Sequence, residues 1–107
     1  EVIIGCKRDP VYGPFIAVGT GGSLTNILAD RSYVFLPASG KELRAAFKRT
    51  KLSELLSATQ SEAVLLTLER FQLLLQDHQE IAELEINPLM VTADTAYVAD
   101  VKVTLTQ

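Results

Sequence analysis

The last third of the chain alternates apolar and polar residues with a period of two. The two alternating segments are IAELEINPLMV (81–91) and AYVADVKVTLT (96–106), separated by a short turn at Ala93-Asp94. Successive side chains of a β-strand point to opposite faces of the sheet, so the pattern predicts an antiparallel hairpin. A two-residue and a four-residue loop impose the same register, which sets Asn87 opposite Asp100 and Glu85 opposite Lys102.

This register divides the hairpin into an apolar and a polar face. We expect a core on the face that carries Leu84, Ile86, Met90, Tyr97, Val101, Val103 and Leu105. The polar face carries Glu83, Glu85, Asn87, Asp100 and Lys102.

The polar face offers oxygen ligands in an arrangement that suits Mg²⁺. Directly opposed residues have Cβ atoms about 5 Å apart, so one cation roughly 2.1 Å from each oxygen can bridge Asn87 and Asp100. Mg²⁺ takes one or two carboxylates together with water and substrate phosphate. Lys102, on the same face, can meet a phosphate as a point charge.

A plainer interpretation of the same face stays open. It is a solvated face of an edge hairpin, with Glu85 and Lys102 as a surface ion pair worth about 0–1 kcal/mol. Pro88 within the strand indicates a bulge or an edge position.

The middle of the chain is predicted to be helical. Ser39 with Glu42, and Thr59 with Glu62, fit the capping-box spacing. They predict helices over 40–48 and 61–78, with a short helix at 51–57 between them. In the long helix the apolar residues recur at steps of three and four, and Leu66, Leu73 and Leu74 widen the apolar stripe, which predicts a helix held against a sheet.

The first third reads as three strands, around VII (2–4), FIAVG (15–19) and SYVFLP (32–37), with turn residues in KRDPVYGP. We therefore expect residues 1–107 to form a single α+β domain in the order β-β-β-α-α-α-β-β, a mostly antiparallel sheet with helices packed on one face.

Composition excludes several functional classes. Thirteen acidic against ten basic residues leave a net charge of −3, which argues against binding nucleic acid or an anionic membrane. No apolar run approaches the ~20 residues that span a bilayer. One cysteine and one histidine give neither a disulfide scaffold nor a zinc site, and no nucleophile with an evident base is found, so no catalytic residue is predicted. We expect a cytoplasmic protein. Because the chain starts at Glu1 and not at a methionine, we also expect it to be a fragment of a longer protein.

The first hairpin supplies a second candidate site. A loop near Pro10 brings Glu1 opposite Thr20 or Gly21, beside the sequence GTGG (19–22). Gly21 and Gly22 let the backbone approach a ligand closely, so the Glu1 carboxylate can accept ribose hydroxyls while the amides face phosphate. Alternatively, the glycines only end a strand and Glu1 is a frayed end.

Two segments, EVIIGCKRDPVYGPFIAVGTGG and EIAELEINPLMV…AYVADVKV, resemble the ATP-grasp domain of ADP-forming acyl-CoA synthetases and, more distantly, the β subunit of succinyl-CoA synthetase. The same domain occurs in bacterial protein lysine acetyltransferases. The likeness covers nearly the whole chain, with DPxxGP, GxGG, LP and ELEINPL in the family order. It implies the C-terminal part of an ATP-grasp fold that binds Mg²⁺ with ATP or ADP. By position, Glu1 matches the ribose-binding carboxylate, Asn87 and Asp100 the magnesium ligands, and Glu85 an acidic position beside them.

The chain also departs from the family pattern. Asn26 stands where the family has an acidic residue, which bears on the phosphate side of the site. The N-terminal half of the ATP-grasp fold, the CoA-binding domain and the phosphorylated histidine of the family lie outside these residues, so we do not expect the fragment alone to be catalytically competent.

The resemblance implies part of an acid–CoA ligase whose partners are a nucleotide, the rest of the ATP-grasp domain and a CoA-binding domain or subunit. Two alternatives stay open: a non-catalytic regulatory ATP-grasp domain attached to an acetyltransferase, and a plain α+β interaction module.

Overall fold

The computed structural model describes residues 1–21 and 30–106. The strands and helices are β1 (Val2–Asp9), β2 (Gly13–Thr20), β3 (Arg31–Phe35), α2 (Gly40–Lys48), α3 (Leu52–Leu55), α4 (Ala58–Asp77), β4 (Ile81–Val91), β5 (Ala96–Val98) and β6 (Val101–Leu105). The order agrees with the prediction except at the end, where the single expected strand is two strands, β5 and β6.

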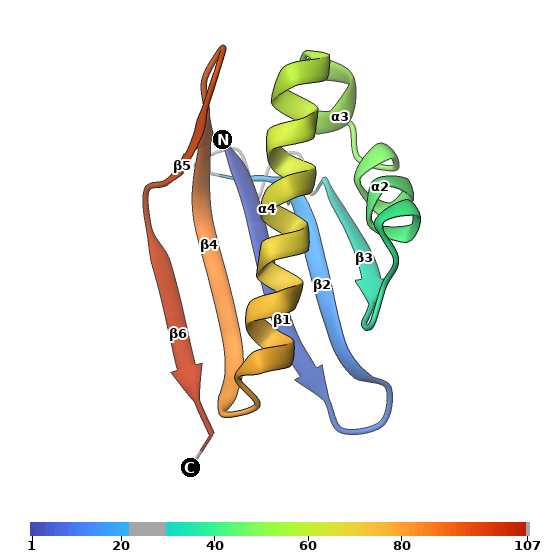
Figure 1. The fold of residues 1–107 in the computed structure, drawn as a ribbon, viewed down its shortest axis with the longest axis vertical. Helices are drawn as coiled ribbons and strands as arrows, with labels where there is room; N and C mark the ends of the chain where they lie inside the picture. Colours follow the sequence, from blue (N-terminus) through green and yellow to red (C-terminus); the bar gives the residue numbers. More distant parts are fainter. Residues whose placement is uncertain (22–29, 107) are drawn as a thin grey trace.

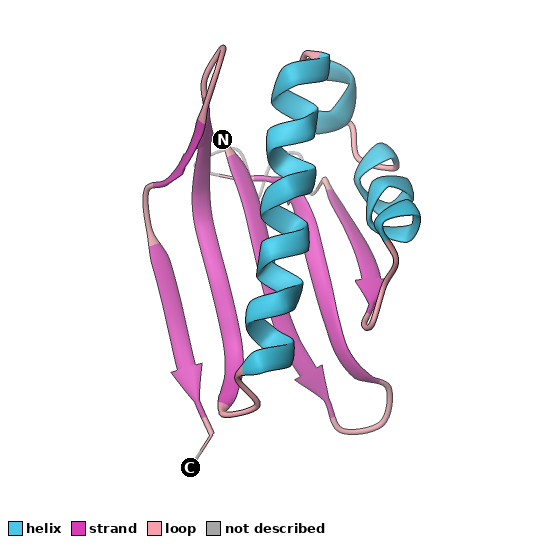
Figure 2. Cartoon of the chain, in the orientation of Figure 1, coloured by secondary structure: helices cyan, strands magenta, loops and turns pink. Residues whose placement is uncertain are grey.

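The described strands form one antiparallel sheet in the order β3-β2-β1-β4-β5, with β6 also paired to β4. The helices lie on one face of this sheet, and α4 runs along it in front of β1 (Figure 1). Figure 2 shows the same two layers coloured by element type. The predicted α+β class, with helices on one face, is confirmed. No helix in the described ranges is long and apolar enough to cross a membrane.

The core lies between the sheet and the helices. Strands β1 and β2 present alternate residues to it, and α2 and α4 close it from above. The single cysteine, Cys6, is buried in this core. Full burial of a large aliphatic or aromatic side chain stabilises the fold by about 1.5–3 kcal/mol. The largest fully buried hydrophobic side chains are Phe47, Ile4, Ile16, Leu43, Leu68, Leu75, Leu89, Val2, Val18 and Val64.

Helix α2 begins as predicted: Ser39 accepts a hydrogen bond from the Glu42 amide, and the Glu42 side chain accepts one from the Ser39 amide. The predicted long helix is present as α4, but its predicted N-cap, Thr59, was wrong. Its N-cap is Ser57, which forms the reciprocal box with Gln60, so Thr59 and Glu62 lie inside the helix. Glu62 instead forms an ion pair with Arg44 of α2, at 2.9 Å.

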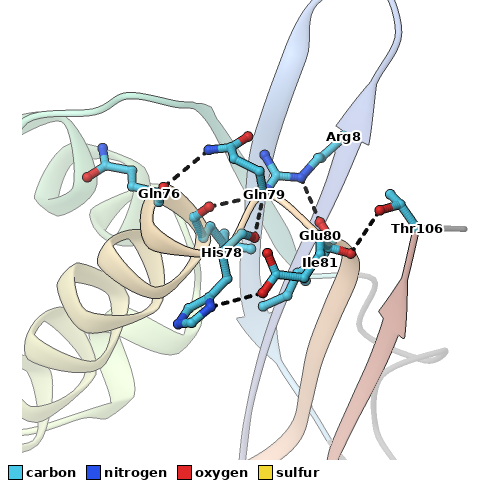
Figure 3. Close-up of polar contacts among 8 residues, drawn as sticks. Arg8, Gln76, His78, Gln79, Glu80, Ile81 and Thr106 are labelled. Carbon is cyan, nitrogen blue, oxygen red and sulfur yellow. Dashed lines mark hydrogen bonds and ion pairs between the residues drawn. The ribbon is translucent and has the colours of Figure 1, made fainter.

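The C-terminal end of α4 is tied to β1 by Arg8. Its Nε donates to the carbonyl of Ile81 at 2.6 Å, and Nη2 donates to the carbonyls of Leu75 and His78 at 3.0 and 3.3 Å. Figure 3 shows Arg8 with His78 and Ile81 around the turn that leads into β4. Arg8 thus satisfies helix-end carbonyls that have no partner within α4.

The apolar surface extends beyond this core. Leu66, Leu73 and Leu74, expected in the stripe against the sheet, are exposed. Leu84 and Ile86 of the hairpin's predicted core face are buried, whereas its members on β5 and β6 (Tyr97, Val101, Val103 and Leu105) are exposed. Among the described residues α4 covers the sheet near β1 and does not extend over β6 (Figure 1).

Met90 was also predicted to face the core, and this prediction was wrong. The neighbouring Leu89 is the buried residue. The pairing of β4 with β1 shifts by one residue between Ile86 and Leu89. A bulge of this kind reverses the alternation of side chains beyond it. The irregularity indicated by Pro88 is therefore present.

Candidate functional site

The predicted hairpin register is confirmed. Glu85 pairs with Lys102 in the β4–β6 ladder, and Leu89 pairs with Val98 in the β4–β5 ladder. Between these two ladders the amide of Asn87 donates to the carbonyl of Asp100 at 3.1 Å. Asn87 and Asp100 therefore lie on neighbouring segments, directly opposite one another, with Asn87 half-buried and Asp100 exposed.

The opposed pair lies where both chains depart from regular strand. On one side β5 ends at Val98 and β6 begins at Val101, so residues 99–100 break the strand that the sequence predicts as continuous. On the other side β4 bulges relative to β1, and the Asn87–Pro88 peptide is cis.

The sheet face opposite the helices carries a groove of about 530 Å³. Its floor follows a row of residues that are in register across five strands: Lys102, Glu85, Gly5, Ala17 and Tyr33. Gly5 and Ala17 have small side chains or none, so the groove is deepest in the middle of this row. Charged side chains line its sides. The charged residues lining the groove are Lys7, Arg31, Glu83, Glu85 and Lys102.

These charges do not neutralise one another in pairs. In the part of the chain that the structure describes, the ion pairs within 4.0 Å are Arg44–Glu62 and, when His78 is protonated, His78–Glu80. Glu85 and Lys102 face each other across the strands without forming one, contrary to the surface ion pair of the plainer interpretation. Three cations and two carboxylates on one open face suit a ligand that carries both phosphate and a divalent metal.

The first hairpin also has the expected register. Val2 pairs with Thr20, and the Gly21 amide donates to the Glu1 carbonyl at 3.1 Å, so Glu1 lies opposite Gly21. Gly22 and Asn26 lie outside the described residues.

The structure also gives a packing reason for two of the glycines. A Cβ on Gly19 would lie 1.8 Å from the carbonyl oxygen of Asp30, and one on Gly21 would lie 2.9 Å from the amide of Ile3. At both positions the backbone of a neighbouring segment occupies the space of a side chain.

Asp30 holds the end of β2 in place, and sequence reasoning missed it. Its carboxylate accepts hydrogen bonds from the Thr20 hydroxyl at 3.0 Å and from the amides of Lys51 and Leu52 at 2.9 and 3.0 Å. Burial pushes the pKa of Asp30 up, but the hydrogen bonds and the Lys51 charge together outweigh it and lower the pKa. Asp30 thus caps α3, whose own N-cap, Lys51, makes no side-chain cap.

Arg31 was missed as well. Its Nη1 donates to the carbonyls of Thr20 and Asp30, at 2.7 and 3.1 Å, while the residue lines the groove. Lys7 reaches the same groove from β1. Alternation within each strand could have placed both residues on the open face, but only once the strand order of the sheet was known.

A metal ion at this site would have few protein ligands. The described residues contain no cluster of three or more His, Cys, Asp and Glu side chains that could hold an ion, which argues against an all-protein cage. An amide and a carboxylate on opposed segments, with Glu85 two residues away, are the limited donor set that Mg²⁺ uses when water and substrate phosphate complete its shell. The residues present therefore fit Mg²⁺ bound together with a phosphorylated ligand.

Comparison with protein families matches almost the whole chain: residues 1–105 fit the model of an ATP-grasp domain. Similar proteins include an ADP-forming acetate–CoA ligase of Archaeoglobus fulgidus, 32% identical over 98% of this chain and 16% of its own length. A 4-hydroxybutyrate–CoA ligase (ADP-forming) of Nitrosopumilus maritimus is 34% identical over 85% of this chain and 14% of its length. The β subunit of an ADP-forming acetate–CoA ligase of Pyrococcus furiosus is 29% identical, and the chain spans 48% of it.

Solved structures agree with this assignment. The acetyl-coenzyme A synthetase 1 of Ca. Korarchaeum cryptofilum, in complex with coenzyme A and Mg-AMPPCP, superimposes with a TM-score of 0.90 at 29% identity. The match covers 99% of this chain and 53% of that one. A protein of Pyrococcus horikoshii gives a TM-score of 0.89 at 27% identity, over 99% of this chain and 48% of that one.

Proposed function

Since this chain belongs to the ATP-grasp domain family, we propose that it is the C-terminal part of the nucleotide-binding domain of an ADP-forming acyl-CoA synthetase, an acid–thiol ligase. Several relatives are ADP-forming ligases of acetate or 4-hydroxybutyrate with CoA. The chain spans about half of a relative's β subunit, so the ligase activity would belong to a larger assembly containing the rest of the ATP-grasp domain and a CoA-binding domain or subunit.

The observation that carries this proposal is the opposition of Asn87 and Asp100 beside a charged, open sheet face. These two residues would hold Mg²⁺, with Glu85 next to them on the same strand as Asn87. The bound ion would supply charge neutralisation between nucleotide phosphates. A related structure contains Mg-AMPPCP, which supports the same ligand class for this chain.

The remaining groups would position the nucleotide. Lys102, across from Glu85, would place a point charge next to phosphate oxygens. Glu1 would accept ribose hydroxyls, and the amides of Gly21 and Gly22 would face phosphate. Asp30 would act through Thr20, because it fixes the segment that precedes these glycines.

The chemistry proposed for the whole enzyme is phosphoryl transfer through a phosphohistidine on another domain. The phosphoryl group passes from ATP to the histidine and then to the acid, and CoA displaces it from the acyl phosphate. Positioning and electrostatic stabilisation account for most of the catalysis in phosphoryl transfer. The residues of this chain would therefore bind, orient and neutralise, without forming a covalent bond to the substrate.

The metal assignment is tested with Asp100→Ala in the complete enzyme. Titration calorimetry with ATP, in the presence of Mg²⁺ and in the presence of EDTA, should show that the variant has lost most of its Mg²⁺-dependent affinity. Asp94→Ala, in the exposed turn of the same hairpin, is the matched control and should bind like the wild type. Unchanged Mg-ATP binding by Asp100→Ala would falsify the assignment.

Asn26 stands where the family has an acidic residue. This difference favours a second candidate function, a regulatory nucleotide-binding domain attached to an acetyltransferase. The two are separated by assaying the complete protein for ADP formation that depends on both a carboxylic acid and CoA. Binding of Mg-ATP without this turnover supports the regulatory role.

A further inference from the structure

Three exposed aliphatic side chains follow β6, and a fourth, Leu74, is exposed on α4. Val101, Val103 and Leu105 are 52%, 50% and 58% exposed, and Leu74 is 42% exposed. We call these four residues the β6 strip. Isolated apolar residues are ordinary on protein surfaces, but three at alternate positions of one strand make a continuous apolar edge.

The strip is an extension of the core. Val101, Val103 and Leu105 pair with Ile86, Leu84 and Ile81 of β4, and these three partners are buried beneath the helices. Lys102 and Thr104, between them on β6, line the groove on the opposite face. Alternation along the strand therefore points the three apolar side chains toward the helical layer.

The uncovered space above the strip has the dimensions of one helix. Figure 1 shows α4 in front of β1, with β4 and then β6 beside it. Strands are about 4.8 Å apart, so β6 lies roughly 10 Å to the side of β1. Packed helices lie 8–10 Å apart, axis to axis, so a helix alongside α4 would lie over β6. The five residues of β6 extend about 17 Å, the length of a helix of roughly eleven residues.

We propose that the β6 strip is the docking site of an amphipathic helix supplied by the part of the same enzyme that lies outside these 107 residues. This inference rests on the proposed function, in which the chain acts within a larger synthetase. The P. furiosus β subunit is about twice as long as this chain, so a relative has the additional polypeptide that such a helix requires.

The size of the strip favours a tethered helix over a second copy of the chain. Four half-exposed aliphatic side chains offer a few hundred Å², well below the ~800 Å² that each partner contributes to a stable interface. A helix in the same polypeptide needs less area, because its tether supplies a high effective concentration.

The test uses the complete enzyme grown with a photoreactive diazirine analogue of leucine, which is close to leucine in size and does not displace an occupant. Cross-links from Leu74 and Leu105 should converge on one segment outside the 107 residues, with apolar residues at helical spacing. Leu55, 77% exposed on α3, is the control and should give no such convergence. Cross-links between two copies, or none beyond those of Leu55, overturn the proposal.

Hydrogen exchange provides a second test that does not depend on the photoreactive label. Val103→Asp should increase the hydrogen-exchange rate of the cross-linked segment by at least tenfold, whereas Leu55→Asp should leave it unchanged. An unchanged rate in Val103→Asp overturns the proposal. Neither readout depends on nucleotide, so failure of Mg-ATP binding in the Asp100→Ala experiment and failure of helix docking are distinguishable.

Discussion

Asp30 caps a helix that begins 22 residues later in the chain: its Oδ2 accepts the amide of Leu52 at 3.0 Å. The same oxygen accepts the hydroxyl of Thr20 at 3.0 Å. One buried carboxylate therefore connects the end of β2, at the candidate site, with the start of α3. Its loss would disturb both elements.

Asp30→Asn should destabilise the protein by about 1–3 kcal/mol, because an amide leaves at least one of these donors without its acceptor. The folded-state pKa of Asp30 is lowered, so its contribution is complete above the ordinary pKa of about 4 and is lost as the pH falls through the lowered value. Thermal unfolding followed from neutral to acidic pH should show this step in the wild type. The step should be smaller in Asp30→Asn, and Asp77→Asn, at the exposed end of α4, should retain it.

Arg8→Met should lower the free energy of unfolding by roughly 1–3 kcal/mol, because the carbonyls of Ile81 and Leu75 lose their donor near the end of α4. Methionine keeps most of the apolar length of the side chain, so the loss reports mainly on hydrogen bonding. Urea unfolding gives the change in midpoint. Arg70→Met, on the exposed side of α4, should change the free energy of unfolding by no more than about 0.5 kcal/mol; equal effects of the two variants would contradict this role for Arg8.

Gly19→Ala should be severely destabilising, by more than about 3 kcal/mol, or should prevent folding. The added methyl group would lie 1.8 Å from the carbonyl oxygen of Asp30, and that oxygen belongs to backbone that cannot rotate away. Gly5→Ala is the matched control, since the nearest atom to its new methyl group is 3.9 Å away. Soluble yield and melting temperature of both variants check the prediction, and a Gly19→Ala protein that melts like the wild type contradicts it.

Lys102→Met should weaken nucleotide binding about tenfold, which corresponds to about 1.4 kcal/mol, and should make affinity less sensitive to salt. Lys102 lines the groove, where its charge would lie beside phosphate. Calorimetric titration at two salt concentrations measures both effects. Lys41→Met removes an exposed lysine from α2, in the helical layer, and should change neither; wild-type affinity in Lys102→Met would remove Lys102 from the site.

Much of the arrangement could be predicted because it depends on local patterns. Alternation and turn length predict the pairing of Glu85 with Lys102, and the capping box at Ser39 predicts the first residue of α2. The second box was misplaced because Ser57 with Gln60 and Thr59 with Glu62 satisfy the same spacing, and only packing of the helix selects between them.

The parts that could not be predicted depend on contacts between distant segments. Asp30 caps α3 from 21 and 22 residues away, and Arg8 reaches the end of α4 from 67 residues away. No periodicity or short motif encodes such a contact. The exposure of Val103 also escaped prediction, since alternation identifies the apolar face of a strand but not what covers it.

The position of the helices on one side of the sheet has an evolutionary consequence. Packing constrains the residues beneath the helices, whereas the open face is held mainly by the backbone ladder, so substitutions there change chemistry at little structural cost. A neighbour with 29% identity still superimposes with a TM-score of 0.90. Side chains on the open face can therefore change while the backbone of the sheet behind them keeps its arrangement.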